Sequence, residues 1–292
     1  MNSDLTHVQQ RLLDRVVREL GQLAGVDAVA LGGSYARGRA RPDSDLDVGI
    51  FYSEKTPFDV DGLRRIAEIL NDSPRPVVTS FYEWGRWVNG GAWLTVEGQR
   101  IDLLYRSVEH VERAIADAEA GAYEVDYWQQ PPYGFFSGMY LGEISICVPL
   151  LDPKERLKPL KERVAVYPEP LRRSIVRDAL WGVAFGLRAF APKFAAAEDV
   201  YGTTGCLARF AAQLVMTLFA LNRVYLVNDK TALLEVREFP TAPHDFVARL
   251  KRVLACPGHR AVELAASVEA MTTLFGEVVA CSEGLYEVRY DV

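Results

Sequence analysis

Residues 32–47 read Gly-Gly-Ser-Tyr-Ala-Arg-Gly-Arg-Ala-Arg-Pro-Asp-Ser-Asp-Leu-Asp, and this stretch decides the fold of the N-terminal half. It lies between two apolar runs, residues 28–31 and residues 48–52. Short apolar runs bounded by glycine and polar residues are typical of buried strands. The pattern therefore predicts a strand, a Gly-Ser turn, a polar loop, and a second strand that carries Asp45 and Asp47 at its beginning.

The two aspartates are separated by one residue, Leu46. Side chains alternate faces along a strand, so both carboxylates point the same way, with Cα atoms about 6.5 Å apart. Two like charges at this spacing repel each other unless a cation joins them. Mg²⁺ prefers oxygen ligands and keeps waters and substrate phosphates as its other ligands. The spacing therefore predicts a magnesium site.

The Gly-Ser turn supplies the group that complements this metal site. Glycine allows the backbone to approach a phosphate closely, and a helix that begins near Ser34 directs N–H groups and its positive end at that phosphate. We therefore expect Gly33 and Ser34 to hold the phosphates of a nucleotide. Arg37 has two interpretations, a further phosphate contact or a solvated arginine in the first turn of the helix.

Together, Gly33-Ser34, Arg37-Gly38 and Ser44-Asp45-Leu46-Asp47 resemble the signature of the DNA polymerase β-like nucleotidyltransferase superfamily. That superfamily includes aminoglycoside (kanamycin-type) and lincosamide nucleotidyltransferases and the minimal nucleotidyltransferases of toxin–antitoxin pairs. The resemblance is specific over residues 26–105 and only architectural beyond them. It implies a third carboxylate on a later strand, and Asp102 in the apolar run 101–105 fits this position. A charge inside a strand is costly unless it is paired or bound to metal.

Composition sets the broad class of the protein. The chain has 292 residues, 49% of them hydrophobic and 25% charged, which is typical of a globular protein with two domains. Its net charge of −6 argues against a non-specific polynucleotide binder and favours a small or cationic acceptor, although tRNA stays open. The four cysteines lack metal-ligand spacing, and polar residues interrupt the most apolar stretch, 206–227. We expect a cytoplasmic protein without a membrane span.

We expect an α+β protein with two domains. Residues 1–155 are predicted to form the catalytic domain, a mixed sheet of the polymerase β-like type with flanking helices. Residues 156–292 are predicted to form an all-α helical bundle, because long helical patterns cover about 169–194, 205–227, 243–255 and 259–281. The resemblance implies that such a bundle completes the substrate or nucleotide site. It also allows a homodimer.

Two further features have alternative interpretations. The segment 121–143 is rich in aromatic and acidic residues, and it is either a hydrophobic loop packed between elements or an acceptor pocket that uses Glu124, Asp126 or Glu143. The resemblance implies a basic residue that reaches the triphosphate from the helical domain, and Lys230 matches it. Lys230 could equally be a solvated lysine at a helix C-terminus.

The resemblance implies an enzyme that moves a nucleoside monophosphate from an NTP, ATP first, to a hydroxyl of a small acceptor, such as an aminoglycoside- or lincosamide-like antibiotic. Two Mg²⁺ ions are expected, one on Asp45 and Asp47 and a second shared with Asp102. Asp102 could also accept the proton of the acceptor, with Glu143 in reserve. Two alternatives stay open: a toxin–antitoxin enzyme that modifies a protein or tRNA, and a non-catalytic NTP-binding regulator.

Overall fold

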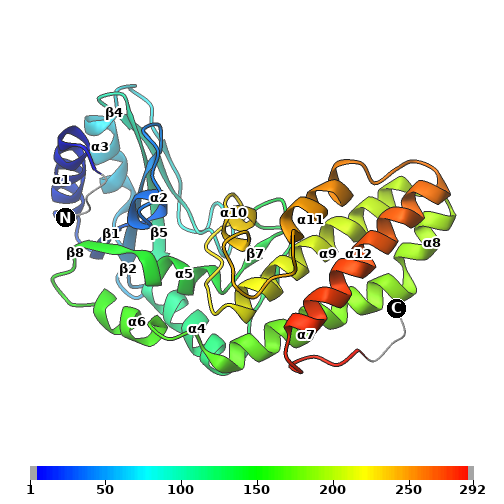
Figure 1. The fold of residues 1–292 in the computed structure, drawn as a ribbon. Helices are drawn as coiled ribbons and strands as arrows, with labels where there is room; N and C mark the ends of the chain where they lie inside the picture. The colour runs from blue at the N-terminus through cyan, green and yellow to red at the C-terminus, as the bar shows by residue number, and fades with distance from the viewer. Residues whose placement is uncertain (1–4, 289–292) are drawn as a thin grey trace. The chain divides into compact units, whose positions relative to one another are not determined.

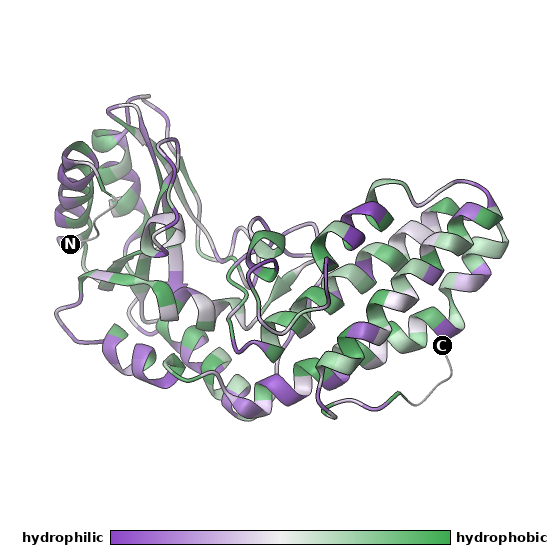
Figure 2. Ribbon diagram, in the orientation of Figure 1, coloured by the Kyte–Doolittle hydropathy of each residue, from purple (hydrophilic) through white to green (hydrophobic). Residues whose placement is uncertain are grey.

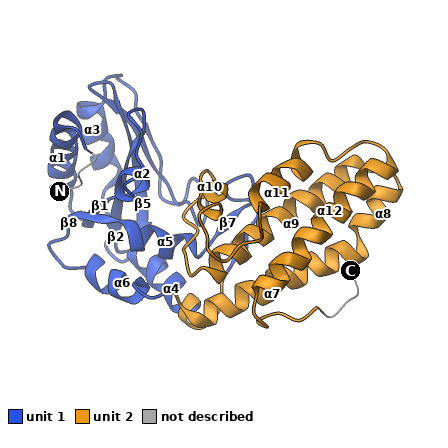
Figure 3. Cartoon of the chain, viewed as in Figure 1, with its two compact units in different colours: residues 1–117, 124–166 blue, residues 118–123, 167–292 orange. Residues whose placement is uncertain are grey.

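The computed structural model describes residues 5–288 and divides into two compact units (Figures 1 and 3). Unit 1 comprises residues 1–117 and 124–166, and unit 2 comprises residues 118–123 and 167–292. Unit 1 contains a mixed sheet with helices, and the described part of unit 2 contains helices and loops. The predicted α+β fold class is therefore confirmed.

Unit 1 is built on a six-stranded sheet with the strand order β3-β4-β5-β2-β1-β8. β2 and β5 run parallel, and every other neighbouring pair is antiparallel. The strands are β1 Val26–Leu31, β2 Leu46–Tyr52, β3 Val77–Val78, β4 Gly91–Val96, β5 Gln99–Ser107 and β8 Val148–Leu151. A separate hairpin joins β6 Val125–Asp126 to β7 Phe135–Phe136. The strands predicted on both sides of residues 32–47 correspond to β1 and β2.

Two helices, α1 (His7–Gly21) and α3 (Val60–Leu70), cover one face of this sheet (Figure 1). Their buried side chains, including Leu13 and Leu63, join one core with alternate residues of the strands. In β2 these core residues are Leu46, Val48, Ile50 and Tyr52. Since neighbours along a strand face opposite sides, the intervening position Asp47 lies on the other face. We call this second face, which α1 and α3 do not cover, the open face.

Unit 1 also contains the helices α2 Gly33–Ala36, α4 Val108–Glu119, which continues into unit 2, α5 Met139–Ile146 and α6 Leu157–Val164. The Nζ of Lys161 in α6 donates to the carbonyls of Ile144 at 3.0 Å and Cys147 at 2.7 Å, at the end of α5. These bonds bind α6 to unit 1. The two units consequently separate between residues 166 and 167 rather than near residue 155, where the sequence suggested a boundary.

Unit 2 contains the helices α7 Glu169–Ala189, α8 Ala191–Ala196, α9 Val200–Leu221, α10 Ala232–Val236, α11 Phe246–Ala255 and α12 Ala261–Cys281. The helix predicted over 169–194 is thus two helices, since α7 ends before Phe190 and α8 begins after it. α9 contacts every other helix of the unit and forms its centre.

α9 and α12 are long and apolar enough to cross a membrane by length and composition (Figure 2). Core helices of globular bundles meet the same two criteria. Of the most apolar window of α9, 56% is buried inside the protein, compared with 33% for α12. The burial of α9 favours the interpretation of this stretch as a bundle helix.

The core between α1 and the sheet yields a prediction about stability. Leu13 is fully buried there, so Leu13→Ala should lower the free energy of unfolding of unit 1 by about 2–5 kcal/mol. Val8 on the same helix is half exposed, and Val8→Ala should change that free energy by about 0.5 kcal/mol or less. Urea unfolding followed by tryptophan fluorescence measures both, because four of the five tryptophans lie in unit 1. Equal losses in the two variants would contradict the assigned core.

Candidate active site

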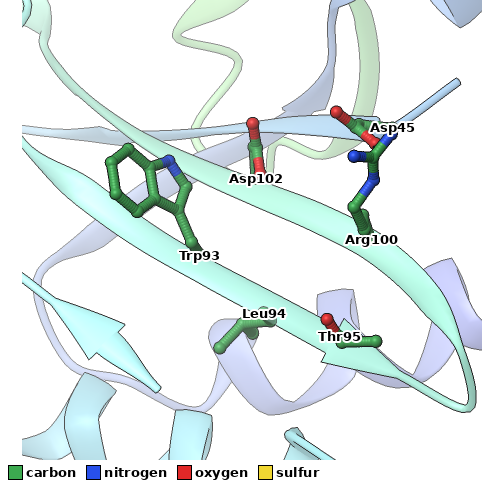
Figure 4. A pocket seen from close by; sticks show the side chains of 6 residues that line it. All are labelled: Asp45, Trp93, Leu94, Thr95, Arg100 and Asp102. Carbon is green, nitrogen blue, oxygen red and sulfur yellow. The ribbon is translucent and has the colours of Figure 1, made fainter.

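Asp47 and Asp102 are directly paired across the sheet. They are register partners on the parallel strands β2 and β5, which places both carboxylates on the open face, on strands about 4.8 Å apart. Asp45 stands just before β2 and lines a wide-open surface cavity of about 380 Å³ together with Asp102 (Figure 4). The other lining residues of this cavity are Trp93, Leu94, Thr95 and Arg100. The third predicted acid therefore faces the same side as the other two.

Asp45 is held at this cavity by the beginning of β5. Its Oδ1 lies 2.6 Å from the Nε of Arg100, and the Asp45 side chain is 34% exposed. This oxygen is buried and pairs with the Arg100 guanidinium without a further hydrogen bond. The amide of Gln99 donates to the carbonyl of Ser44 at 3.1 Å, which ties the polar loop to β5. The loop is thus fixed by contacts that lie more than fifty residues away in the chain.

The Gly-Ser turn packs directly against Asp47. The N–H of Gly32 donates to the carbonyl of Asp47 at 2.8 Å. Gly33 has a φ of +58°, and a Cβ there would lie 1.7 Å from Asp47 Oδ2. Only a residue without a side chain fits this position, since the left-handed backbone and the contact with the carboxylate both exclude a Cβ. The turn and the acids therefore lie on the same side of the sheet.

The helix that follows the turn, α2 (Gly33–Ala36), is a single turn. Tyr35 anchors it, because its ring is buried in the core and its hydroxyl accepts a 2.6 Å hydrogen bond from the Gln9 amide. A helix this short has little macrodipole, so any phosphate contact depends on the first N–H groups, which lack intrahelical partners. Arg37 is the half-buried C-cap residue of α2, and its role as a phosphate contact stays a prediction.

Arg106, which sequence reasoning missed, lies on the open face four residues after Asp102. It is buried, and its Nε and one terminal nitrogen donate to the two oxygens of Glu143 at 2.7 and 2.8 Å. Burial lowers the pKa of Arg106, but the Glu143 charge and hydrogen bonds, and then the Asp47 charge, raise it above the usual value on balance. The sequence held one indication of this residue: Arg106 lies an even number of residues after Asp102 in the same strand, so both side chains face the same side.

This ion pair involves Glu143, which the sequence suggested as a second candidate base. Both oxygens of Glu143 are occupied by a cation that stays charged. The structure therefore places Glu143 as the partner of a buried arginine, and its role as a reserve base stays a prediction. Asp102 is left as the candidate base on the open face.

The predicted Mg²⁺ site can be compared with the side chains that are available to bind the ion. Among residues 5–288, no group of three His, Cys, Asp or Glu side chains is close enough to hold a metal ion by itself. Mg²⁺ is usually held by one or two carboxylates together with substrate phosphates, however. The paired Asp47 and Asp102, with the Asp45 carboxylate beside Asp102, fit a site of that kind. The assignment of all three acids as ligands stays a prediction.

The aromatic segment 121–143 is partly structural. Phe135 is buried and stacks on Trp87, with ring centroids 5.5 Å apart, so packing explains this part of the segment. Trp128, in contrast, is 92% exposed. Lys230 is an exposed residue of unit 2 between α9 and α10, and its contact with the triphosphate stays a prediction.

Residues 13–83 match the family model described as a nucleotidyltransferase domain. The N-terminal unit therefore carries a polymerase β-like nucleotidyltransferase domain. This match includes the Gly-Ser turn, Asp45 and Asp47 and ends before Asp102. Residues 141–230 match a second model, a domain of unknown function named DUF4037, which crosses from unit 1 into unit 2.

One solved structure that resembles this chain is a nucleotidyltransferase-like protein from Exiguobacterium sibiricum 255-15. It shares 8% sequence identity and gives a TM-score of 0.47, over 94% of this chain and 78% of that chain. No curated protein matches the sequence. The similarity to kanamycin-type enzymes stays a prediction.

The contact between Gly33 and Asp47 can be tested against a second glycine. Gly98 also has a positive φ, +79°, but a Cβ there would meet nothing within 4 Å. Gly98→Ala should therefore lower the free energy of unfolding by about 1–2 kcal/mol, from backbone strain alone. Gly33→Ala should lower it further, because the new methyl group must displace the Asp47 carboxylate. Thermal unfolding and a crystal structure of each variant measure this, and equal losses with an unmoved Asp47 would contradict the packing described.

Proposed function

We propose that this chain is an Mg²⁺-dependent nucleotidyltransferase that moves a nucleoside monophosphate from an NTP to a hydroxyl of a small-molecule acceptor and releases pyrophosphate. The observation that carries the proposal is the pairing of Asp47 with Asp102 on the open face, with the Cα of Gly33 packed against the Asp47 carboxylate. Acids and a tight glycine turn at one point are suited to binding a triphosphate and its metal ion. The nucleotidyltransferase domain match supports the same class of reaction.

Each element of the site has a role in this proposal. The turn at Gly33 and Ser34 binds the phosphates of the donor, for which ATP is the expected nucleotide. Asp45, Asp47 and Asp102 are the residues that would hold Mg²⁺, which when bound neutralises phosphate charge and lowers the pKa of a coordinated hydroxyl. The Asp45 carboxylate supports this role, because its Oδ1 is buried against Arg100, a partly exposed partner that a cation can replace.

Asp102 is proposed to receive the proton of the acceptor hydroxyl. It lies on the open face between Ile101 and Leu103, whose side chains are buried in the core on the other face. Its strand also carries Arg106, which holds Glu143 in a bidentate pair. Both oxygens of Glu143 are thereby occupied, and Asp102 is the base in this proposal.

Replacing the acids tests the proposal. Asp47→Asn and Asp102→Asn should each lower the rate of pyrophosphate release by roughly 10²-fold or more, because an amide neither binds the cation well nor accepts the proton. Circular dichroism should show an unchanged fold. The assay uses α-labelled ATP with Mg²⁺ and follows pyrophosphate and the label separately.

The matched control is Asp43→Asn, since Asp43 lies in the same loop but has an exposed side chain. This variant should keep the full rate. Comparable turnover in the Asp47 and Asp102 variants would rule the mechanism out. Label that appears on protein or tRNA in a lysate would identify a macromolecular acceptor, and tight ATP binding without pyrophosphate release would identify a regulator.

The ion pair between Arg100 and Asp45 yields a further prediction. Arg100 lies where a cation would approach Asp45, so the two compete for the carboxylate. Arg100→Gln should lower the Mg²⁺ concentration that gives half-maximal pyrophosphate release by about three- to fivefold, in line with the ~1 kcal/mol of a partly exposed pair. Arg11→Gln, which removes an exposed pair with Glu97, should leave that concentration unchanged. The same result for both variants would show that no cation replaces Arg100 at Asp45.

A further inference from the structure

Three arginines of unit 2 converge on one carboxylate. Glu169, the first residue of α7, accepts two hydrogen bonds at Oε1, from Arg172 at 3.1 Å and from Arg173 at 3.3 Å. Its Oε2 accepts a third from Arg223 at 3.4 Å. Arg223 directly follows the C-cap of α9, so the end of α9 lies beside the first turn of α7 (Figure 1). We call these four residues the arginine cluster.

The arginine cluster carries more positive charge than its carboxylate neutralises. Burial raises the pKa of Glu169, but the hydrogen bond and charge of Arg172 and the charges of the other two arginines lower it on balance. Glu169 is therefore ionised at neutral pH, and arginine is always charged. Three guanidinium charges against one carboxylate leave a net charge of +2 on the cluster. This excess favours an anionic ligand.

One guanidinium of the cluster is buried without being fully satisfied. The Arg172 side chain is 10% exposed, and its Nη1 donates to Glu169. Its Nε is also buried, and it has no hydrogen-bond partner in the described chain. The buried Arg106 uses the same Nε, with a terminal nitrogen, to hold both oxygens of Glu143. A buried charged donor that lacks such a partner indicates a further acceptor at Arg172.

The position of the cluster at the N-terminus of α7 adds to its attraction for an anion. α7 has 21 residues, and no side chain caps its first N–H groups. These groups and the positive end of the helix dipole attract negative charge. Arg173 and Arg223 are more than half exposed, and Glu169 is 40% exposed, so a solute can reach the cluster from solvent.

The donors of the cluster match a phosphate group better than the carboxylate that they now hold. Glu169 offers two oxygens to three guanidiniums, so Arg172 and Arg173 share Oε1. A terminal phosphate offers three oxygens and up to two negative charges. Guanidinium groups bind such oxygens through pairs of parallel hydrogen bonds. A phosphate dianion therefore fits both the number of arginines and the charge of +2.

We propose that the arginine cluster is a binding site for a terminal phosphate group, and that Glu169 competes with this phosphate for the three guanidiniums. The inference goes beyond the proposed function and does not rest on it, because Asp45, Asp47 and Asp102 belong to unit 1 and the cluster belongs to unit 2. The phosphate belongs either to a free inorganic ion or to a nucleotide monoester. Both present the same terminal oxygens.

Calorimetric titration of the full chain at constant ionic strength tests the binding, with inorganic phosphate, pyrophosphate and AMP as probes. Arg223→Gln should weaken the binding of at least one probe about fivefold, as expected for the loss of one partly exposed charge. Arg177→Gln is the matched control, because Arg177 lies on the same helix, is similarly exposed and pairs with Asp178 instead. Binding that is absent in the wild type, or equally weakened in both variants, would overturn the inference.

Glu169→Gln separates a ligand site from a purely structural link between α7 and α9. If Glu169 competes with the ligand, its loss raises the charge of the cluster and should strengthen phosphate binding about fivefold. A structural link predicts no gain, because removing its central carboxylate only loosens the arginines. Thermal unfolding of the variant shows whether it is folded. Unchanged or weaker binding by the folded variant would contradict the proposal.

A crystal of the full chain soaked in sodium tungstate, a heavy analogue of phosphate, locates the anion without any variant. We expect anomalous density within hydrogen-bond distance of Arg172 Nε. Density at the Gly33 turn but not at the cluster would overturn the inference and leave the proposed function standing. Tighter binding of AMP than of pyrophosphate would identify a nucleotide monoester as the ligand, and the reverse order a free ion. Failure of pyrophosphate release in the enzyme assay would leave this site unaffected.

Discussion

The pairing of β2 with β5 is the constraint on which the rest of the site depends. The two strands run parallel, and their register places Asp47 beside Asp102. A shift of one residue would move either acid to the face covered by α1 and α3, because side chains alternate with a period of two. The apolar positions on the covered face oppose such a shift, since Leu46, Val48 and Ile50 would lose their burial. The hydrophobic core thus holds the carboxylates at the surface and together.

Carboxylates held this close require compensating charge, and two arginines of β5 supply it on the same face. Arg100 lies against Asp45 near the beginning of the strand. Arg106 lies further along, buried with Glu143 and close enough to Asp47 for that charge to raise its pKa. The exposed Arg100 pair contributes little to stability and is open to competition by a cation, whereas the buried Arg106 pair is costly to break. Arg100 therefore suits a site where a bound cation can replace it, and Arg106 suits a structural role.

The open face also shows how small residues determine where large ones stand. Gly33 lets the turn touch Asp47, and Gly91 lets Trp84 lie over β4 beside Trp93. The nucleotidyltransferase domain match covers the first glycine but not the second, as it ends at residue 83.

The sequence by itself determined the two strands around residues 32–47, the common face of Asp45 and Asp47, and the helical second half, because local periodicity of apolar residues is visible along the chain. Tertiary structure alone decided three things: that Arg106 occupies Glu143, that Trp93 stands opposite Asp102, and that α6 belongs to unit 1. Each depends on strand register or on hydrogen bonds between distant residues, and no local pattern records which distant residue becomes a neighbour.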